Sequence, residues 1–203
     1  MKKFVILLIL AWIGQSCCTT QYLVPLQNLD AIAGLGVSSN LGSKSWSPKM
    51  GGQIGVEAPL FRFTQSSSVV TGLGASFQGA AWEEEMYSGK VNTSYLNIPF
   101  LYTYESPGGF YGQAGLQPGF LLSAKDKYDE GSYDYKDNMN KFDLGFPLAA
   151  GFIINDKVRV GARANIGLIN NSNYPGGNKD HNFTFNAVFN YRFNLPGKNS
   201  NNQ

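Results

Sequence analysis

The sequence predicts an all-β fold, an eight-stranded antiparallel up-and-down β-barrel that spans a membrane, and three observations lead to this prediction. Eight segments alternate apolar and polar side chains, and the connections between them alternate between short and long. The polar face of these segments carries few charged residues. A period of two places successive side chains on opposite faces of a strand. Short turns at one end and long loops at the other are typical of an even-stranded transmembrane barrel.

The last segment, residues 182–193, shows the alternation most clearly. Its apolar members at every second position are Phe183, Phe185, Ala187, Phe189, Tyr191 and Phe193. Amide, hydroxyl and guanidinium groups fall between them, with Val188 as the exception. No helix sorts residues in this way, and about ten residues is the length of strand that crosses a bilayer at a tilt. This aromatic face must therefore meet either a protein core or lipid.

The seven preceding segments follow the same pattern, the fifth least regularly. They span residues 31–41, 50–61, 68–82, 92–105, 109–124, 141–154 and 157–169. Their apolar faces carry, in this order, Ala33, Leu35 and Val37; Ile54, Val56, Ala58 and Leu60; Val69, Leu73, Ala75 and Phe77; Leu96, Ile98, Phe100, Tyr102 and Tyr104; Leu116, Phe120 and Leu122; Phe142, Leu144, Phe146, Leu148, Ala150, Phe152 and Ile154; and Val158, Val160, Ala162, Ala164, Ile166 and Leu168. The opposite faces are mostly Gly, Ser, Asn and Gln. Each segment therefore predicts a strand with one apolar face.

The connections place the barrel in its membrane. Short turns are expected at 64–67, 106–108 and 155–156, and long polar loops at 42–49, 83–90, 125–140 and 170–181. In an outer-membrane barrel the long loops face outward, so both chain ends are expected on the periplasmic side. Pro99, Pro118 and Pro147 each remove a ladder hydrogen bond and are expected at bulges or strand ends.

The two ends of the chain lie outside the predicted barrel, which covers residues 31–193. Residues 1–20 begin with a basic stretch and continue into a short apolar run, which predicts a secretory signal peptide that is removed. Residues 21–30 are expected to be a linker, and residues 194–203 a polar tail. Cys17 and Cys18 lie at the expected cleavage region, and acylation of Cys17 remains an alternative to their removal.

Composition favours lipid as the partner of the apolar face. Charged residues make up 15% of the chain, against roughly 25% in an ordinary soluble domain. The apolar face continues over nearly all segments, and aromatic residues gather near strand ends, as interfacial girdles do. A soluble lipocalin-like ligand-binding barrel with its apolar face inward is the alternative. The net charge of +2 and the absence of a basic run exclude a nucleic-acid partner.

Three stretches also resemble a known family. Residues 95–102 (YLNIPFLY), residues 110–115 (FYGQAG) with Pro118 and Gly119, and the closing residues 190–193 (NYRF) are similar to the PorT-like outer-membrane β-barrel proteins of Bacteroidetes-type bacteria. The resemblance implies a barrel in the bacterial outer membrane, inserted by the outer-membrane assembly machinery. The tail at 194–203 departs from it, because many such barrels end at the terminal aromatic residue.

Five charged residues on the polar face form the candidate site, a structural lumen network made of Glu57, Asp143, Arg159, Arg163 and Arg192. Eight strands leave an interior just wide enough for side chains, so these charges are expected to pair with one another and fill the lumen. A small-solute pore is the alternative.

The loops carry no recognisable catalytic or cofactor motif, and neither a cofactor nor a metal is expected. Acidic residues are frequent at 125–140, but their spacing matches no calcium loop. His181, the single histidine, lies near Ser172 in sequence, which leaves a lipid-modifying enzyme as an alternative. We therefore expect a non-enzymatic structural or surface-interaction role, with a protein partner at the outer loops.

Overall fold

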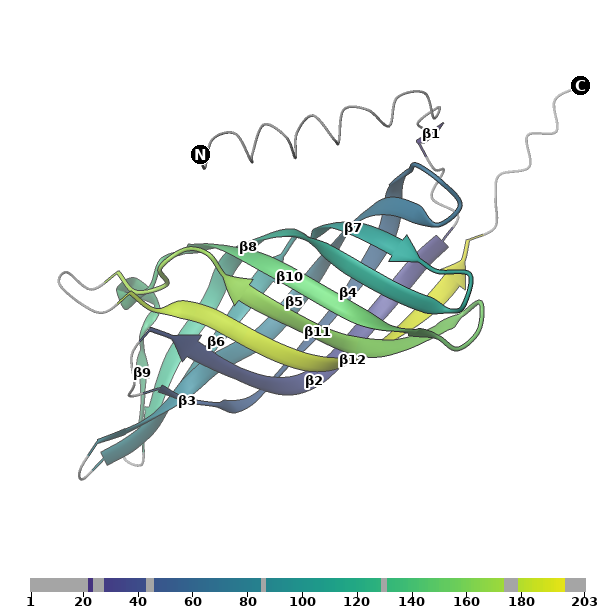
Figure 1. The fold of residues 1–203 in the computed structure, drawn as a ribbon. Coiled ribbons are helices and arrows are strands. Elements are labelled where there is room, and N and C mark those ends of the chain that lie inside the picture. Colours follow the sequence, from purple (N-terminus) through teal and green to yellow (C-terminus); the bar gives the residue numbers. More distant parts are fainter. Residues whose placement is uncertain are drawn as a thin grey trace, which may run out of the picture.

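The computed structural model describes residues 22–23, 28–42, 46–84, 87–128, 131–173 and 179–195. The predicted signal peptide, Cys17 and most of the predicted polar tail lie outside these ranges. The described chain consists almost entirely of strands (Figure 1). None of its helices is long and apolar enough to cross a membrane.

Nine strands form the barrel wall, and the remaining elements that the structure describes are short additions at its ends. The wall contains β2 (Asn28–Leu41), β4 (Lys49–Arg62), β5 (Ser67–Glu84), β6 (Tyr87–Asn97), β7 (Phe100–Glu105), β8 (Phe110–Tyr128), β10 (Phe142–Ile153), β11 (Val158–Gly167) and β12 (His181–Asn194). The additions are β1 (Tyr22–Leu23), β3 (Trp46–Ser47), β9 (Gly131–Asp134) and the 3-10 helix η1 (Lys136–Asn138).

The strands close into a ring. The order is β2, β12, β11, β10, β8, β6 with β7, β5 and β4, which returns to β2, and all neighbours are antiparallel. Because β6 and β7 share one position, the ring has eight strands. The first and last wall strands close it along their whole length, from His181 opposite Leu41 to Asn194 opposite Asn28. This confirms the predicted eight-stranded up-and-down barrel.

The polar face points inward and the apolar face outward. Along β12, Asn182, Thr184 and Asn186 are buried, whereas Phe185 is 49% and Phe189 47% exposed. The same alternation holds around the ring, and most large exposed side chains on the wall are apolar. Burial inside the ring is therefore polar, which is opposite to the arrangement in a soluble barrel with an apolar interior.

Of the three prolines for which the sequence predicts irregularities, two lie at interruptions of the wall. Pro99 lies in the break between β6 and β7. The ladder between β10 and β8 runs from Gly145 opposite Gln117 directly to Leu148 opposite Ala114, so Pro147 lies in a gap of the pairing. Pro118, by contrast, keeps its position opposite Leu144. The missing proline N–H groups explain the two interruptions.

The two ends of the barrel differ as predicted, but the outer end contains more strand than expected (Figure 1). The described chain starts and ends near the short turns, and the long connections lie at the other end. The predicted loop at 83–90 is mostly strand, because β5 reaches Glu84 and β6 begins at Tyr87. The predicted loop at 125–140 continues β8 to Tyr128 and adds β9. Alternation and cross-strand pairing continue there, although the charged side chains suggested a loop.

Candidate functional site: the lumen and its outer end

Glycines on the inward face make room for large side chains in the lumen. A Cβ atom on Gly161 would lie 2.6 Å from the Tyr111 hydroxyl, and one on Gly151 would lie 2.8 Å from the Tyr111 ring. Tyr111 itself is 1% exposed. Small residues on β10 and β11 thus let an aromatic side chain of β8 fill the interior, where a larger residue would collide with it.

A salt bridge crosses the middle of the lumen. Arg163 of β11 donates from Nη1 to Glu57 Oε1 of β4 at 2.8 Å and from Nη2 to Glu57 Oε2 at 3.3 Å. The same Nη2 donates to Gln113 Oε1 at 2.8 Å, and Gln113 donates to Thr103 Oγ1 at 3.1 Å. The Arg163 and Glu57 side chains are each 5% exposed. The bidentate geometry and the further hydrogen bond to Gln113 offset part of the cost of burying two opposite charges in this interior.

A second group of charges lies near the short-turn end. Arg192 donates to both oxygens of Asp30 at 2.8 and 3.0 Å. Arg159 forms ion pairs with Glu105 at 2.7 Å and Asp30 at 3.6 Å. The Arg159 guanidinium also lies 5.9 Å from the centroid of the Tyr111 ring. Two arginines and two acids therefore neutralise one another at this end.

Asp143 lies apart from the arginines, toward the outer end. Asn182 donates to Asp143 Oδ2 at 2.8 Å and to the Tyr95 hydroxyl at 3.2 Å. Asn171 extends the group by donating to Asn182 Oδ1 at 2.9 Å and to Asn40 Oδ1 at 3.1 Å. Among the described residues, no arginine or lysine forms an ion pair with Asp143. Amide donors hold this carboxyl group instead of a cation.

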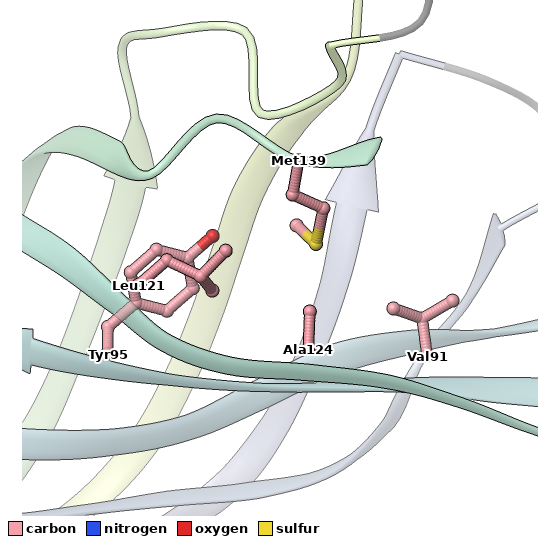
Figure 2. Close-up of a cluster of buried hydrophobic side chains, with 5 residues drawn as sticks. All are labelled: Val91, Tyr95, Leu121, Ala124 and Met139. Carbon is pink, nitrogen blue, oxygen red and sulfur yellow. The ribbon is translucent and has the colours of Figure 1, made fainter. Parts of the chain in front are cut away.

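An apolar cluster occupies the outer end of the lumen (Figure 2). Its buried members are Val91, Tyr95, Leu121, Ala124 and Met139. Met139 comes from the connection after η1 and points toward Ala124, so a residue of an outer connection packs onto side chains of the wall. Trp46, Trp82 and Tyr135 are partly buried and pack against this cluster.

Two outer connections are joined above this cluster. Met139 forms an isolated antiparallel bridge with Ser172. The Asn140 N–H donates to the Asn171 carbonyl at 2.9 Å, and the Asn173 N–H donates to the Asn138 carbonyl at 2.9 Å. The connection after β8 and the connection after β11 therefore form one covering layer over the apolar cluster.

The remaining predicted candidates lie at the outer rim. His181 begins β12 opposite Leu41, whereas Ser172 bridges Met139. Asp126 accepts a hydrogen bond from Trp82 Nε1 at 3.0 Å. Within the described ranges, no group of three or more histidine, cysteine or acidic side chains could hold a metal ion.

Asp30, Glu105 and Met139 are among the contributors to these groups that sequence reasoning missed. Asp30 falls in the expected linker and Glu105 at the edge of a turn. Asp30 could have been found by pairing the first and last strands, because it then lies directly opposite Arg192. Met139 gives no comparable signal, because its place follows from how the two connections fold over the mouth.

Comparison with known proteins assigns the chain to a family. Residues 23–173 match the family model described as "Outer membrane protein beta-barrel domain". The chain belongs to this family. Members of it, as the description states, are outer-membrane barrels, so the polar-inward wall places its exposed apolar face in the bacterial outer membrane.

Two solved barrels of this outer-membrane type are similar in fold. Ail, the attachment invasion locus protein of Yersinia pestis, is 14% identical with a TM-score of 0.50, and the match covers 83% of this chain and 100% of that chain. Neisserial surface protein A is 11% identical with a TM-score of 0.50, covering 86% of this chain and 100% of that chain. A search of curated protein sequences returned no match. The predicted outer-membrane location is confirmed.

Proposed function

We propose that this outer-membrane barrel has a non-enzymatic surface-interaction role, carried out by the outer ends of its strands. The observation that carries the proposal is the extension of β5, β6, β8 and β9 beyond the apolar band. Aromatic side chains are exposed on this extension, with Tyr87 at 66%, Tyr133 at 60% and Tyr128 at 45%. Exposed tyrosines on a rigid support are common anchors of protein interfaces. A protein partner at the outer face is the occupant we expect.

The filled lumen supports this role over that of a pore. The Arg163–Glu57 salt bridge crosses the interior, and the apolar cluster around Met139 covers its outer end. Water and ions would need a continuous path through both. In planar bilayers we expect the purified barrel to give no stepwise conductance, and reproducible steps would instead support the small-solute pore.

Photo-crosslinking in intact cells tests the interaction itself. A photoreactive residue at Tyr87 or Tyr133 is expected to give discrete adducts, while the same residue at Asp156, in a short turn at the opposite end, gives a different set or none. The proposal fails if the two outer positions give no adduct, or if they give the same adducts as the Asp156 control.

Within its family we further infer a PorT-like barrel that is exported with a signal peptide and inserted by the outer-membrane assembly machinery. The stretch at 95–102 supports this inference, since its Tyr95 fills the lumen and its Pro99 separates β6 from β7. A mature N-terminus between residues 15 and 25 in the purified membrane protein would support export by cleavage. An intact Met1 would contradict it.

The proposal also implies that His181 has no catalytic role. We expect a His181→Ala variant to leave the lipid composition of the outer membrane the same as the wild-type protein leaves it. A change in acylation that depends on the wild-type protein and disappears with this variant would favour the lipid-modifying enzyme.

A further inference from the structure

Lysines gather on the outward face of the wall, beyond the apolar band and toward the outer end of the strands. On β5, β6 and β8 the last large outward apolar residues are Phe77, Leu96 and Leu122. The outward positions beyond them include Lys90, Lys125 and Lys127, all exposed. Their neighbours in sequence, Val91 and Ala124, are buried in the lumen cluster. Because side chains alternate along a strand, the three ammonium groups lie on the side of the wall that faces the membrane.

Two of these lysines lie directly opposite each other on adjacent strands. Lys90 lies directly opposite Lys127 in the β6–β8 ladder. Lys49 reaches the same area and donates to Asn92 Oδ1 at 2.6 Å, and the charges of Lys90 and Lys127 repel its ammonium group. Like charges directly opposite each other on adjacent strands are destabilising. The barrel therefore carries an electrostatic cost at this place.

Few nearby groups in the described chain offset this charge. None of the ion pairs found among the described residues includes Lys49, Lys90, Lys125 or Lys127. Two acids are nearby: Asp134 lies opposite Lys125 in the β8–β9 ladder, and Glu83 lines the same surface. Among the side chains that the structure describes, four lysines thus lie near two carboxylates. An external anion would relieve the repulsion between Lys90 and Lys127.

The surface around these lysines is hollowed. A hollow of about 440 Å³ has the polar residues Ser47, Glu83, Ser88, Lys90 and Lys127 in its lining, and Ala81, Trp82, Gly89 and Tyr128 complete it. Ser47, Ala81 and Lys90 belong to one row across β3, β5 and β6, which continues to Lys127 on β8. Hydroxyl donors therefore lie beside two ammonium groups, and phosphate oxygens accept from both kinds of donor.

We propose that this hollow binds the phosphorylated headgroup of a lipid in the outer leaflet. Lys90 and Lys127 share the outward face of β6 and β8 with lipid-facing apolar residues and lie beyond them toward the outer end, so we place the hollow in the headgroup region of the membrane in which the barrel lies. Phosphate monoesters would supply negative charge to balance the lysines. The proposal depends on the outer-membrane location and the outward lysines. Tyr128 lines the hollow, whereas Tyr87 and Tyr133 are not among its lining residues, so the proposal does not depend on a protein partner at those two tyrosines.

The test compares two lipids and two sets of variants in the full mature barrel in mild detergent. Native mass spectrometry measures retention of bisphosphorylated lipid A and of the same lipid after dephosphorylation. We expect the wild-type barrel to retain the phosphorylated lipid. The double variant Lys90→Gln with Lys127→Gln should bind this lipid about 25-fold more weakly, which corresponds to about 1 kcal/mol for each basic residue near an anionic surface. Lys157→Gln, in the short turn at the other end, is the matched control and is expected to change nothing.

Three results would overturn the proposal. These are equal retention of the two lipids, unchanged retention by the double variant, and an equal loss in the Lys157→Gln control. Inorganic phosphate in competition separates the sources: we expect it to displace the lipid only weakly, because it lacks acyl chains beside the apolar band. Full displacement by millimolar phosphate would show a site for soluble phosphate and would contradict the lipid assignment. Heat-modifiable gel mobility confirms that each variant is folded.

Discussion

At the residue scale, the lumen requires each buried guanidinium group to have an acidic partner. Arg163 reaches Glu57, and Arg159 and Arg192 reach Asp30 and Glu105. A buried charge that loses its partner keeps the cost of desolvation without the compensating attraction. The effect of removing an acid should therefore depend on how deeply the pair is buried.

Glu57→Gln should strongly destabilise the barrel, because it leaves the Arg163 charge buried beside a neutral amide. We expect the free energy of unfolding to fall by about 3–5 kcal/mol. Urea titration in detergent, followed by heat-modifiable gel mobility, measures this change. Glu105→Gln is the matched control, since the Glu105 side chain is 32% exposed and Arg159 keeps Asp30. The double variant Glu57→Gln with Arg163→Met should recover much of the lost stability. Equal losses for Glu57→Gln and Glu105→Gln would contradict the dependence on burial.

The contacts around Gly161 predict how a substitution there changes the stability of the barrel. An added methyl group would collide with the Ala150 carbonyl and would meet the Tyr111 hydroxyl at 2.6 Å. Gly161→Ala should therefore destabilise the barrel by about 1–3 kcal/mol through overpacking. The same urea titration applies, and Gly108→Ala is the control, because its Cβ would have only Ser106 Oγ, at 3.7 Å, within reach. An unchanged midpoint for Gly161→Ala would show that the lumen is looser than described.

At the scale of elements, the two connections over the mouth act as one unit. The connection after β8 supplies Met139 and Asn140, and the connection after β11 supplies Asn171 and Ser172. Backbone hydrogen bonds between them hold Met139 against the other members of the apolar cluster. Separation of these connections would uncover the outer end of the lumen.

A disulfide across the bridge between Met139 and Ser172 tests this arrangement. Residues directly opposite in an antiparallel pair have the spacing that a disulfide needs. Met139→Cys with Ser172→Cys is therefore expected to oxidise readily in the folded barrel, and a shift in gel mobility that is reversed by reductant measures it. Tyr133→Cys with Ser172→Cys is the control and should remain reduced. Slow or incomplete oxidation of the first pair, matching the control, would mean that the connections do not meet.

At the scale of the whole molecule, the sequence predicts the barrel and its orientation well because one physical pattern governs nearly the entire wall. Every second residue of a transmembrane strand faces lipid, so the alternation in residues 182–193 determines both the strand and its lipid-facing side. The same periodicity predicts that the side chains of Arg159, Arg163 and Arg192 point into the lumen. It does not predict their acidic partners, because an acid several strands away is brought near an arginine only when the ring closes.

The parts that sequence reasoning missed depend on contacts between distant segments. Asp30 becomes the partner of Arg192 because β2 closes on β12. The strand extensions of β5 and β8 depend on pairing with β6 and β9, and their charged residues resemble those of a loop. The covering of the mouth by Met139 likewise has no periodic signal. These features arise from pairing and packing, which local patterns do not encode.

The most direct test of the account measures which side of β12 meets lipid. Both cysteines of the sequence, Cys17 and Cys18, precede the barrel, so single-cysteine variants at positions 185–190 can each carry one spin label after removal of those two. In reconstituted bilayers, accessibility to oxygen should be high at Phe185, Ala187 and Phe189 and low at Asn186 and Asn190. High oxygen accessibility at Asn186 and Asn190 with low accessibility at Phe185, Ala187 and Phe189 would contradict a barrel whose polar face points inward.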